Sequence, residues 1–255
     1  MNINLAIAAR ARAGEALTVA EIDELGSSDV LSLGMLSDEV RRARVGETVT
    51  FTRVIELQGG SKDPPLPGEA APLQSEGAEL RMTSLPATLD EVEGLIAEAR
   101  MLAGPQLLTG FSLADIIDRH WGTLGDVLKR LKRAGLDAIV EAPVDRLHDA
   151  EDALKACEAA GLPVRCLSLQ SPIEGDGRSS WLIHLRNLVT KFPKIDTVNP
   201  LPRGQSIAVP TTGYEDVRAV ALARLALPSV RNIQVDWAQY GPKLAQVALT
   251  FGAND

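Results

Sequence analysis

Polar side chains that could do chemistry lie near the ends of apolar, strand-like segments. Asn232–Trp237 alternates as a strand, with two apolar side chains on one face and Gln234 and Asp236 on the other. A buried carboxylate on a strand is a candidate acid–base or ligand-binding group, because burial and neighbouring charge tune its pKa. Asp236 is therefore the first candidate catalytic residue, and a structural pair with Arg53 is the alternative.

Other strand-like segments carry polar residues at their ends as well. If those strands are parallel, their carboxyl ends meet at one mouth, where barrel enzymes have their sites. Glu141 is the second candidate acid–base residue. Arginine forks suit a carboxylate or phosphate, so the set predicts a small polar ligand, and ion pairs at the barrel rim are the alternative for each member. The candidate ligand-binding residues are Arg53, Glu56, Asp145, Arg146, Gln170, Asn199, Arg203, Gln234 and Tyr240.

The elements that must position these residues alternate between strand and helix. Short links between them predict parallel pairing with right-handed crossovers. The fold class is therefore α/β, a parallel (β/α) TIM-type barrel that is either complete or lacks its last strand, since a closed barrel needs eight strands. Residues 1–255 are predicted to form one domain. Seven strands are predicted, at residues 47–57, 79–84, 106–111, 136–142, 162–169, 195–200 and 232–237.

Residues 1–46 are predicted to be an N-terminal helical cover. Thr18 and Glu21 form a capping box, and a second helix is expected from Asp29 to Arg44. The apolar positions of that helix that are predicted to cover one end of the barrel are Leu31, Met35, Leu36 and Val40.

Residues 58–78 read QGGSKDPPLPGEAAPLQSEGA, which is too rich in Pro and Gly for regular structure. A connection of this length is either a functional lid or a solvated loop.

Composition limits the classes of partner. The 255 residues carry a net charge of −8, and the longest basic block, Lys129–Arg133, reads as a solvated helix face. Nucleic acid and anionic membranes are therefore not expected as partners. No run reaches transmembrane length and no signal peptide is evident, so a cytoplasmic protein is expected. The histidines, His120, His148 and His184, have no metal-ligand spacing, so no metal site is predicted.

Four segments resemble a known family. VALARLALPSVRNIQVDWAQYGPKLAQVALTFGAND, LGMLSDEVRRARVGETVTF, FSLADI and LGDVLKRLKRAGLD are similar, in order, to segments of the radical S-adenosylmethionine enzymes that make aminofutalosine and the deazaflavin precursor. The resemblance implies a barrel fold and a setting in menaquinone biosynthesis through futalosine.

One feature departs from that family. Its members bind a four-iron cluster through three cysteines in the loop after the first strand, whereas residues 58–78 contain none. Cys157 and Cys166 lie in separate predicted elements and read as small core residues. A cluster-less relative with no cofactor is therefore expected, and binding of S-adenosylmethionine is left open.

Three functional hypotheses follow from this departure. The first is binding of a small polar metabolite, with non-radical acid–base chemistry by Asp236 and Glu141. The second is a non-catalytic partner of a paralogous radical enzyme. The third is an active radical enzyme with an unusual cluster site.

Overall fold

The computed structural model describes residues 3–57, 79–172, 177–204 and 212–255. The Pro/Gly-rich stretch 58–78 lies outside the described residues. The chain divides into two compact units, which we call the central unit, Phe51–Arg165, and the terminal unit, Met1–Thr50 together with Cys166–Asp255. The expectation of a single domain over residues 1–255 remains a prediction.

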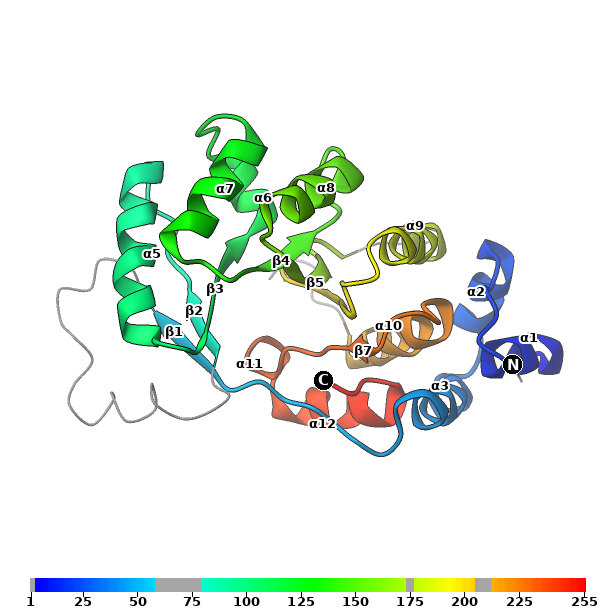
Figure 1. Cartoon of the computed structure of the whole chain (residues 1–255). Coiled ribbons are helices and arrows are strands. Elements are labelled where there is room, and N and C mark those ends of the chain that lie inside the picture. The colour runs from blue at the N-terminus through cyan, green and yellow to red at the C-terminus, as the bar shows by residue number, and fades with distance from the viewer. Residues whose placement is uncertain (1–2, 58–78, 173–176, 205–211) are drawn as a thin grey trace. The chain divides into compact units, whose positions relative to one another are not determined.

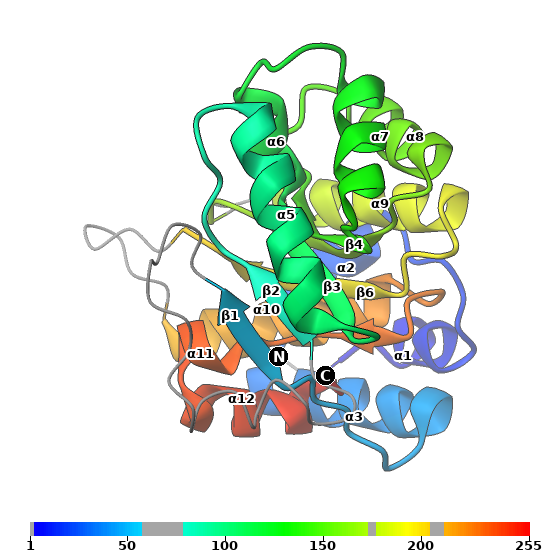
Figure 2. The same ribbon diagram turned by 60° about the vertical axis from the view of Figure 1, so that its left-hand side comes forward.

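The central unit is built on four parallel strands that follow one another in chain order. Helix α5 packs on β3, and α7 packs between α5 and α8 (Figures 1 and 2). The elements are β1 (Val54–Leu57), β2 (Glu79–Met82), α5 (Leu89–Ala103), β3 (Leu107–Ser112), α6 (Leu113–Asp118), α7 (Leu124–Ala134), β4 (Ala138–Pro143) and α8 (Ala150–Ala160).

The terminal unit holds three more parallel strands, also in chain order. Helix α10 is its centre and contacts β6, β7, α2, α3, α9 and α12. The elements are α1 (Leu5–Arg12), α2 (Val19–Gly26), α3 (Val30–Val45), β5 (Val164–Leu169), α9 (Gly177–Lys191), β6 (Thr197–Pro202), α10 (Gly213–Ala226), β7 (Asn232–Ile233), α11 (Trp237–Tyr240), α12 (Pro242–Ala248) and the short 3-10 helix η1 (Leu249–Phe251). The predicted α/β class is confirmed, with seven parallel strands and a set of N-terminal helices among the residues that the structure describes.

Local sequence signals mark the starts of several helices, including the one predicted at Thr18. Thr18 and Thr88 each form a complete capping box, in which the hydroxyl accepts from the backbone three residues on and a glutamate accepts from the cap's own N–H. The side chains of Thr123 and Thr212 also accept a backbone N–H and cap α7 and α10, but no glutamate side chain completes a capping box there. These contacts span three residues, which is why they could be read from sequence.

The buried face of α3 differs from the predicted one. Leu31 and Met35 are 65% and 75% exposed, whereas Leu33, Leu36 and Val40 are buried. Gly34 lies on the buried side, because a Cβ at that position would overlap the ring of Phe251. The helix therefore turns Gly34 toward the ring of Phe251 in η1, where a larger side chain would not fit. The spacing of apolar residues alone does not predict this contact.

The first and last predicted strands are much shorter than expected. The first covers Val54–Leu57 rather than residues 47–57, and the last covers only Asn232–Ile233. The last strand stops because Asp236 is the N-cap of α11, so the chain turns into a helix where alternation predicted more strand. Helix α6 was not predicted.

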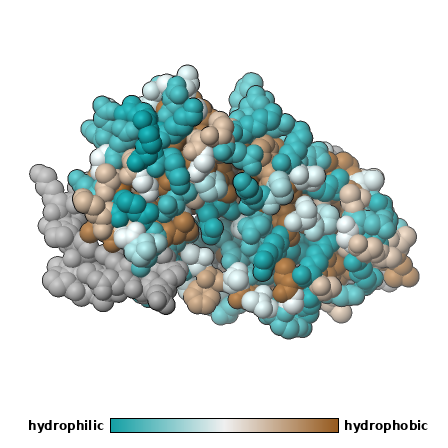
Figure 3. All heavy atoms as spheres, viewed as in Figure 1, coloured by the Kyte–Doolittle hydropathy of each residue, from teal (hydrophilic) through white to brown (hydrophobic). Residues whose placement is uncertain are grey.

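The basic block of α7 is a solvated face, as predicted. Leu131 is fully buried, while Lys129, Lys132 and Arg133 are exposed. Hydrophilic side chains gather over α7 in Figure 3. None of the described helices is long and apolar enough to cross a membrane.

Candidate functional site

The residues that follow β6 continue its pairing with β5. The backbone N–H groups of Arg203 and Gly204 donate to the carbonyls of Leu169 and Gln170, each at 2.7 Å. This pairing carries the parallel contact with β5 past the strand ends. These two hydrogen bonds therefore fix the backbone position of Arg203.

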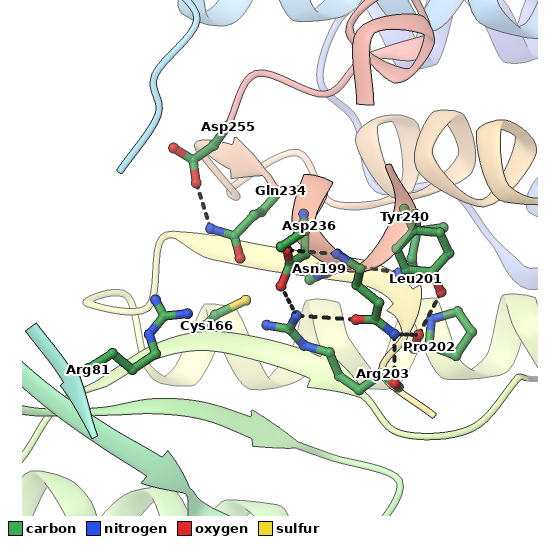
Figure 4. A network of polar contacts seen from close by, with 12 residues as sticks. Arg81, Cys166, Asn199, Leu201, Pro202, Arg203, Gln234, Asp236, Tyr240 and Asp255 are labelled. Atoms are coloured by element: carbon green, nitrogen blue, oxygen red, sulfur yellow. Dashed lines mark hydrogen bonds and ion pairs between the residues drawn. The ribbon is translucent and has the colours of Figure 1, made fainter. Parts of the chain in front are cut away.

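The Arg203 guanidinium is paired with Asp236 (Figure 4). Nη1 of Arg203 lies 2.5 Å from Oδ2 of Asp236 and 3.4 Å from Oε1 of Gln239. The Arg203 side chain is 16% exposed and that of Asp236 is 25% exposed. The pair is therefore part-buried, where charge-assisted hydrogen bonds are less screened than at the surface.

Both carboxylate oxygens of Asp236 are engaged. While Oδ2 accepts from Arg203, Oδ1 accepts from the backbone N–H groups of Ala238 at 3.0 Å and Gln239 at 3.3 Å. Asp236 thus caps α11 and orients Arg203 at once. This geometry supports a positioning role, and the acid–base role predicted for Asp236 remains a hypothesis.

Two further side chains of α11 lock the end of β6. Gln239 Nε2 donates to the carbonyls of Pro202 at 2.9 Å and Arg203 at 2.6 Å. Tyr240 Oη donates to the same Pro202 carbonyl at 2.6 Å. Gln239 and Tyr240 therefore hold the backbone at the end of β6, while Asp236 holds the Arg203 side chain.

Asn199 lies inside an irregular part of β6. Leu167 pairs with Val198 but Leu169 pairs with Pro202, so β6 has extra residues opposite Ser168. The side chain of Asn199 is fully buried, and its Oδ1 accepts from the backbone N–H of Leu201 at 3.0 Å.

The remaining polar candidates of the terminal unit have structural partners. Gln234 Nε2 donates to Asp255 Oδ2 at 2.7 Å (Figure 4). The side chain of Gln170 lies against Gly204, where an added Cβ would come within 2.8 Å of its amide nitrogen. The structure thus brings together Gln170, Asn199, Arg203, Gln234, Asp236 and Tyr240 within one unit.

The other predicted site residues form a separate set in the central unit. Glu141 is half-buried in β4 and pairs with the position of Ser112. Arg146 Nη1 lies 2.7 Å from Asp115 Oδ1 and also pairs with Asp118, so it forms the ion pair that was the alternative interpretation. The members of this set are Arg53, Glu56, Glu141, Asp145 and Arg146.

A buried carboxylate of the central unit was not predicted as a candidate. Glu79 is 3% exposed, and its Oε1 accepts from Arg81 Nη2 at 2.6 Å and from Thr109 Oγ1 at 2.7 Å. Spacing by two residues puts Glu79 and Arg81 on the same face of β2, a signal that the sequence does contain.

A second missed residue is Arg224, which is fully buried in α10. Nε donates to the Gly252 carbonyl at 2.8 Å, Nη1 donates to the carbonyls of Val230 and Arg231, and Nη2 donates to Asn254 Oδ1. Burial lowers the pKa of Arg224 to about 9, with smaller contributions from two neighbouring arginines. These bonds tie the last residues of the chain to α10, which is a structural role.

The two thiols do not fit an iron–sulfur cluster. Burial in α8 raises the pKa of Cys157 to about 12, which disfavours the thiolate that a metal needs. Cys166 is buried in β5, and its Sγ donates to the carbonyl of Leu167. Within the described ranges, no group of three or more His, Cys, Asp or Glu side chains could hold a metal ion.

Sequence comparison finds one family match and several relatives. Residues 189–255 match the family described as CofH/MqnC C-terminal region. The chain is 25% identical over 269 residues to the 5-amino-6-(D-ribitylamino)uracil–L-tyrosine 4-hydroxyphenyl transferase of Archaeoglobus fulgidus, covering 86% of this chain and 78% of that one. It is 32% identical over 158 residues to the transferase of the same name from Methanopyrus kandleri, covering 51% of this chain and 42% of that one.

Structure comparison agrees on the fold. Methylornithine synthase (PylB) matches with a TM-score of 0.68 at 14% identity, covering 97% of this chain and 84% of that one. HydG, a maturase of the [FeFe]-hydrogenase, matches with a TM-score of 0.64 at 12% identity, covering 98% of this chain and 66% of that one. These likenesses confirm the fold class, a parallel (β/α) barrel-type fold.

The comparisons also correct the cofactor expectation. The sequence pointed to a chain with no cofactor, but the relatives and structural neighbours are radical S-adenosylmethionine enzymes, which bind an iron–sulfur cluster and S-adenosylmethionine. The expectation of a chain with no cofactor is therefore wrong. The chain has their fold, and its residues 189–255 are similar to the C-terminal region of the CofH/MqnC family.

Proposed function

We propose that the polar end of β5–β7 binds a small polar metabolite, with Arg203 as its anion-binding group. The observation that carries this proposal is the Arg203 guanidinium, which is part-buried and held by Asp236 at the carboxyl end of a parallel strand. In this fold the carboxyl ends of the strands are where ligands bind. A planar guanidinium kept in one orientation suits a carboxylate or another paired oxygen acceptor.

The relatives narrow the ligand class. Their name specifies a ribitylaminouracil and L-tyrosine, so we propose that this chain binds one of these two kinds of molecule. The name does not support the futalosine setting that the resemblance implied. Asp236 serves as the positioning residue of Arg203 in this proposal, and Glu141 remains the candidate acid–base group. The comparisons do not favour the alternative of a non-catalytic partner subunit.

Calorimetric titration with 5-amino-6-(D-ribitylamino)uracil and with L-tyrosine tests the proposal. The wild-type protein should bind one probe, and Arg203→Gln should weaken that binding at least tenfold, because a hydrogen bond to a charged group contributes about 1.5–3 kcal/mol. Arg231→Gln, which changes an exposed arginine of the same unit, is the matched control and should bind as the wild type does. Binding of neither probe, or equal affinity in Arg203→Gln, would contradict the proposal.

A further inference from the structure

Three buried polar side-chain atoms of the terminal unit have no hydrogen-bond partner among the described residues: Trp181 Nε1 on α9, and Asn199 Nδ2 and Ser168 Oγ on neighbouring strands. The side chains of Asn199 and Ser168 are both fully buried. Buried donors are nearly always paired, because leaving one without a partner costs the full loss of its hydration. Two such atoms on neighbouring strands therefore need an explanation.

The orientation of the Asn199 amide is fixed by its own strand. The irregular pairing of β6 frees the Leu201 N–H from the ladder, and Asn199 Oδ1 accepts it at 3.0 Å. A flipped amide would set an NH₂ group against that N–H, so the oxygen must occupy this position. The NH₂ group is then the free end, and it carries two donors.

Ser168 is placed beside these donors. It lies on β5 between Leu167, which pairs with Val198, and Leu169, which pairs with Pro202, so it is opposite the irregular segment that holds Asn199. Paired strands lie about 4.8 Å apart, which lets a hydroxyl and an amide on facing residues reach one ligand group.

Other amides of the same unit show that this fold satisfies such groups elsewhere. Asn254 Nδ2 donates to Asn232 Oδ1 at 3.0 Å, and Asn232 Nδ2 donates to Thr197 Oγ1 at 3.3 Å. Gln234 Nε2 donates to Asp255. On the described strands of this unit, the unpaired buried donors are those of Ser168 and Asn199, and Asn199 is close in sequence to Arg203.

We propose that Ser168 and Asn199 form a recognition site that donates hydrogen bonds to an sp² oxygen of the ligand, a carbonyl or a carboxylate. This inference rests on the function proposed for Arg203 and adds to it the ligand group that the protein recognises, an sp² oxygen. An amide NH₂ and a hydroxyl side by side match the oxygen of a pyrimidinedione ring or of an amino acid carboxylate. An irregular strand next to a site commonly re-aims a side chain in this way.

The test compares Ser168→Ala and Asn199→Asp with the wild type, using 5-amino-6-(D-ribitylamino)uracil and L-tyrosine as separate probes. Asn199→Asp keeps the acceptor for Leu201 but removes both donors, and it should weaken binding of one probe about tenfold. Ser168→Ala should weaken the same probe several-fold. Loss of the uracil assigns a ring carbonyl, and loss of tyrosine assigns a carboxylate. Asn232→Asp is the control, since the donor that it removes already has a protein partner.

A second measurement separates this inference from the function on which it rests. Ser168→Ala should raise the melting temperature of the ligand-free protein by about 2 °C, because it removes a buried hydroxyl without a partner. A fall would show that the hydroxyl is held by a buried water, and it would overturn the inference. If Arg203→Gln loses binding while both new variants bind within twofold of the wild type, the recognition site fails and the proposed function stands. If the wild type binds neither probe, the proposed function fails and the melting shift alone decides this site.

Discussion

Arg203 and Asp236 are 33 residues apart in sequence, yet Nη1 of the first lies 2.5 Å from Oδ2 of the second. The contact joins the end of β6 to the first turn of α11. Because the other oxygen of Asp236 caps that helix, a single carboxylate fixes both the helix start and the direction of the guanidinium. Its two roles can be separated by substitution.

Asp236→Ser should keep the helix cap and lose only the ion pair. We expect it to cost less than about 1 kcal/mol of unfolding free energy, since the pair is part-exposed, whereas Asp236→Ala should cost about 1–2 kcal/mol because the cap is lost too. Both variants should weaken ligand binding, because Arg203 loses its orientation in each. Urea unfolding and calorimetric titration measure the two effects, and an Asp236→Ala protein as stable as the wild type would show that the cap contributes nothing.

Arg224 should be intolerant of even a conservative change. Arg224→Lys supplies one nitrogen where Nε, Nη1 and Nη2 now reach different acceptors, so buried carbonyls are left without donors. We expect a loss of about 3–5 kcal/mol in unfolding free energy. Arg231→Lys, at an exposed position, should change stability by less than about 0.5 kcal/mol. Chemical denaturation of both variants checks the difference.

The same burial predicts a pH dependence. The folded pKa of Arg224, about 9, lies below the ordinary value of 12.5, so the unfolded chain binds the extra proton between these limits. The unfolding free energy contributed by this group therefore rises with pH above 9, and the cost of burying its charge is fully present below 9. The wild type should gain about 1.4 kcal/mol relative to Arg224→Gln between pH 8 and pH 10. A difference that stays constant over that range would contradict the assignment.

Gly252→Ala should be strongly destabilising. The glycine has φ of +100°, and an added Cβ would overlap Ser37 Oγ and lie 2.9 Å from Arg224 Cβ. Gly46→Ala is the matched control, because Gly46 also has positive φ, +72°, but no atom within 4 Å of the added Cβ. We expect Gly252→Ala to lose at least about 2 kcal/mol more than the control. Adding Ser37→Ala should recover part of that loss, and the absence of any recovery would point to backbone strain alone.

Features that depend on local contacts were predictable from sequence. The caps at Thr18 and Thr88 and the α/β alternation required only neighbours a few residues away. The partner of Asp236 was not predictable, since Arg53 and Arg203 were equivalent as arginines at strand ends. The exposed side of α3 depended on Phe251, more than two hundred residues downstream.

The site was predictable as a set of residues but not as a set of contacts. Asn199, Arg203 and Asp236 were named from their positions at strand ends. The irregular pairing of β6, which orients the Asn199 amide, has no sequence signature beyond its prolines, Pro200 and Pro202, which cannot donate to a ladder. The burial of Glu79 and of Arg224 was not predicted, because charged residues are usually exposed and nothing in their neighbouring sequence distinguishes these two.

The terminal unit is assembled from the two ends of the chain, and this orders events during synthesis. Ser37 Oγ donates to the Phe251 carbonyl at 2.8 Å, and α3 packs against α10 and η1. Helices α1–α3 leave the ribosome long before α10 and η1 are synthesised, so their apolar faces stay exposed during that time. The central unit has contacts that are closer in sequence and can already form. We expect nascent chains that stop before α10 to bind chaperones through α1–α3 and to release them once η1 has emerged.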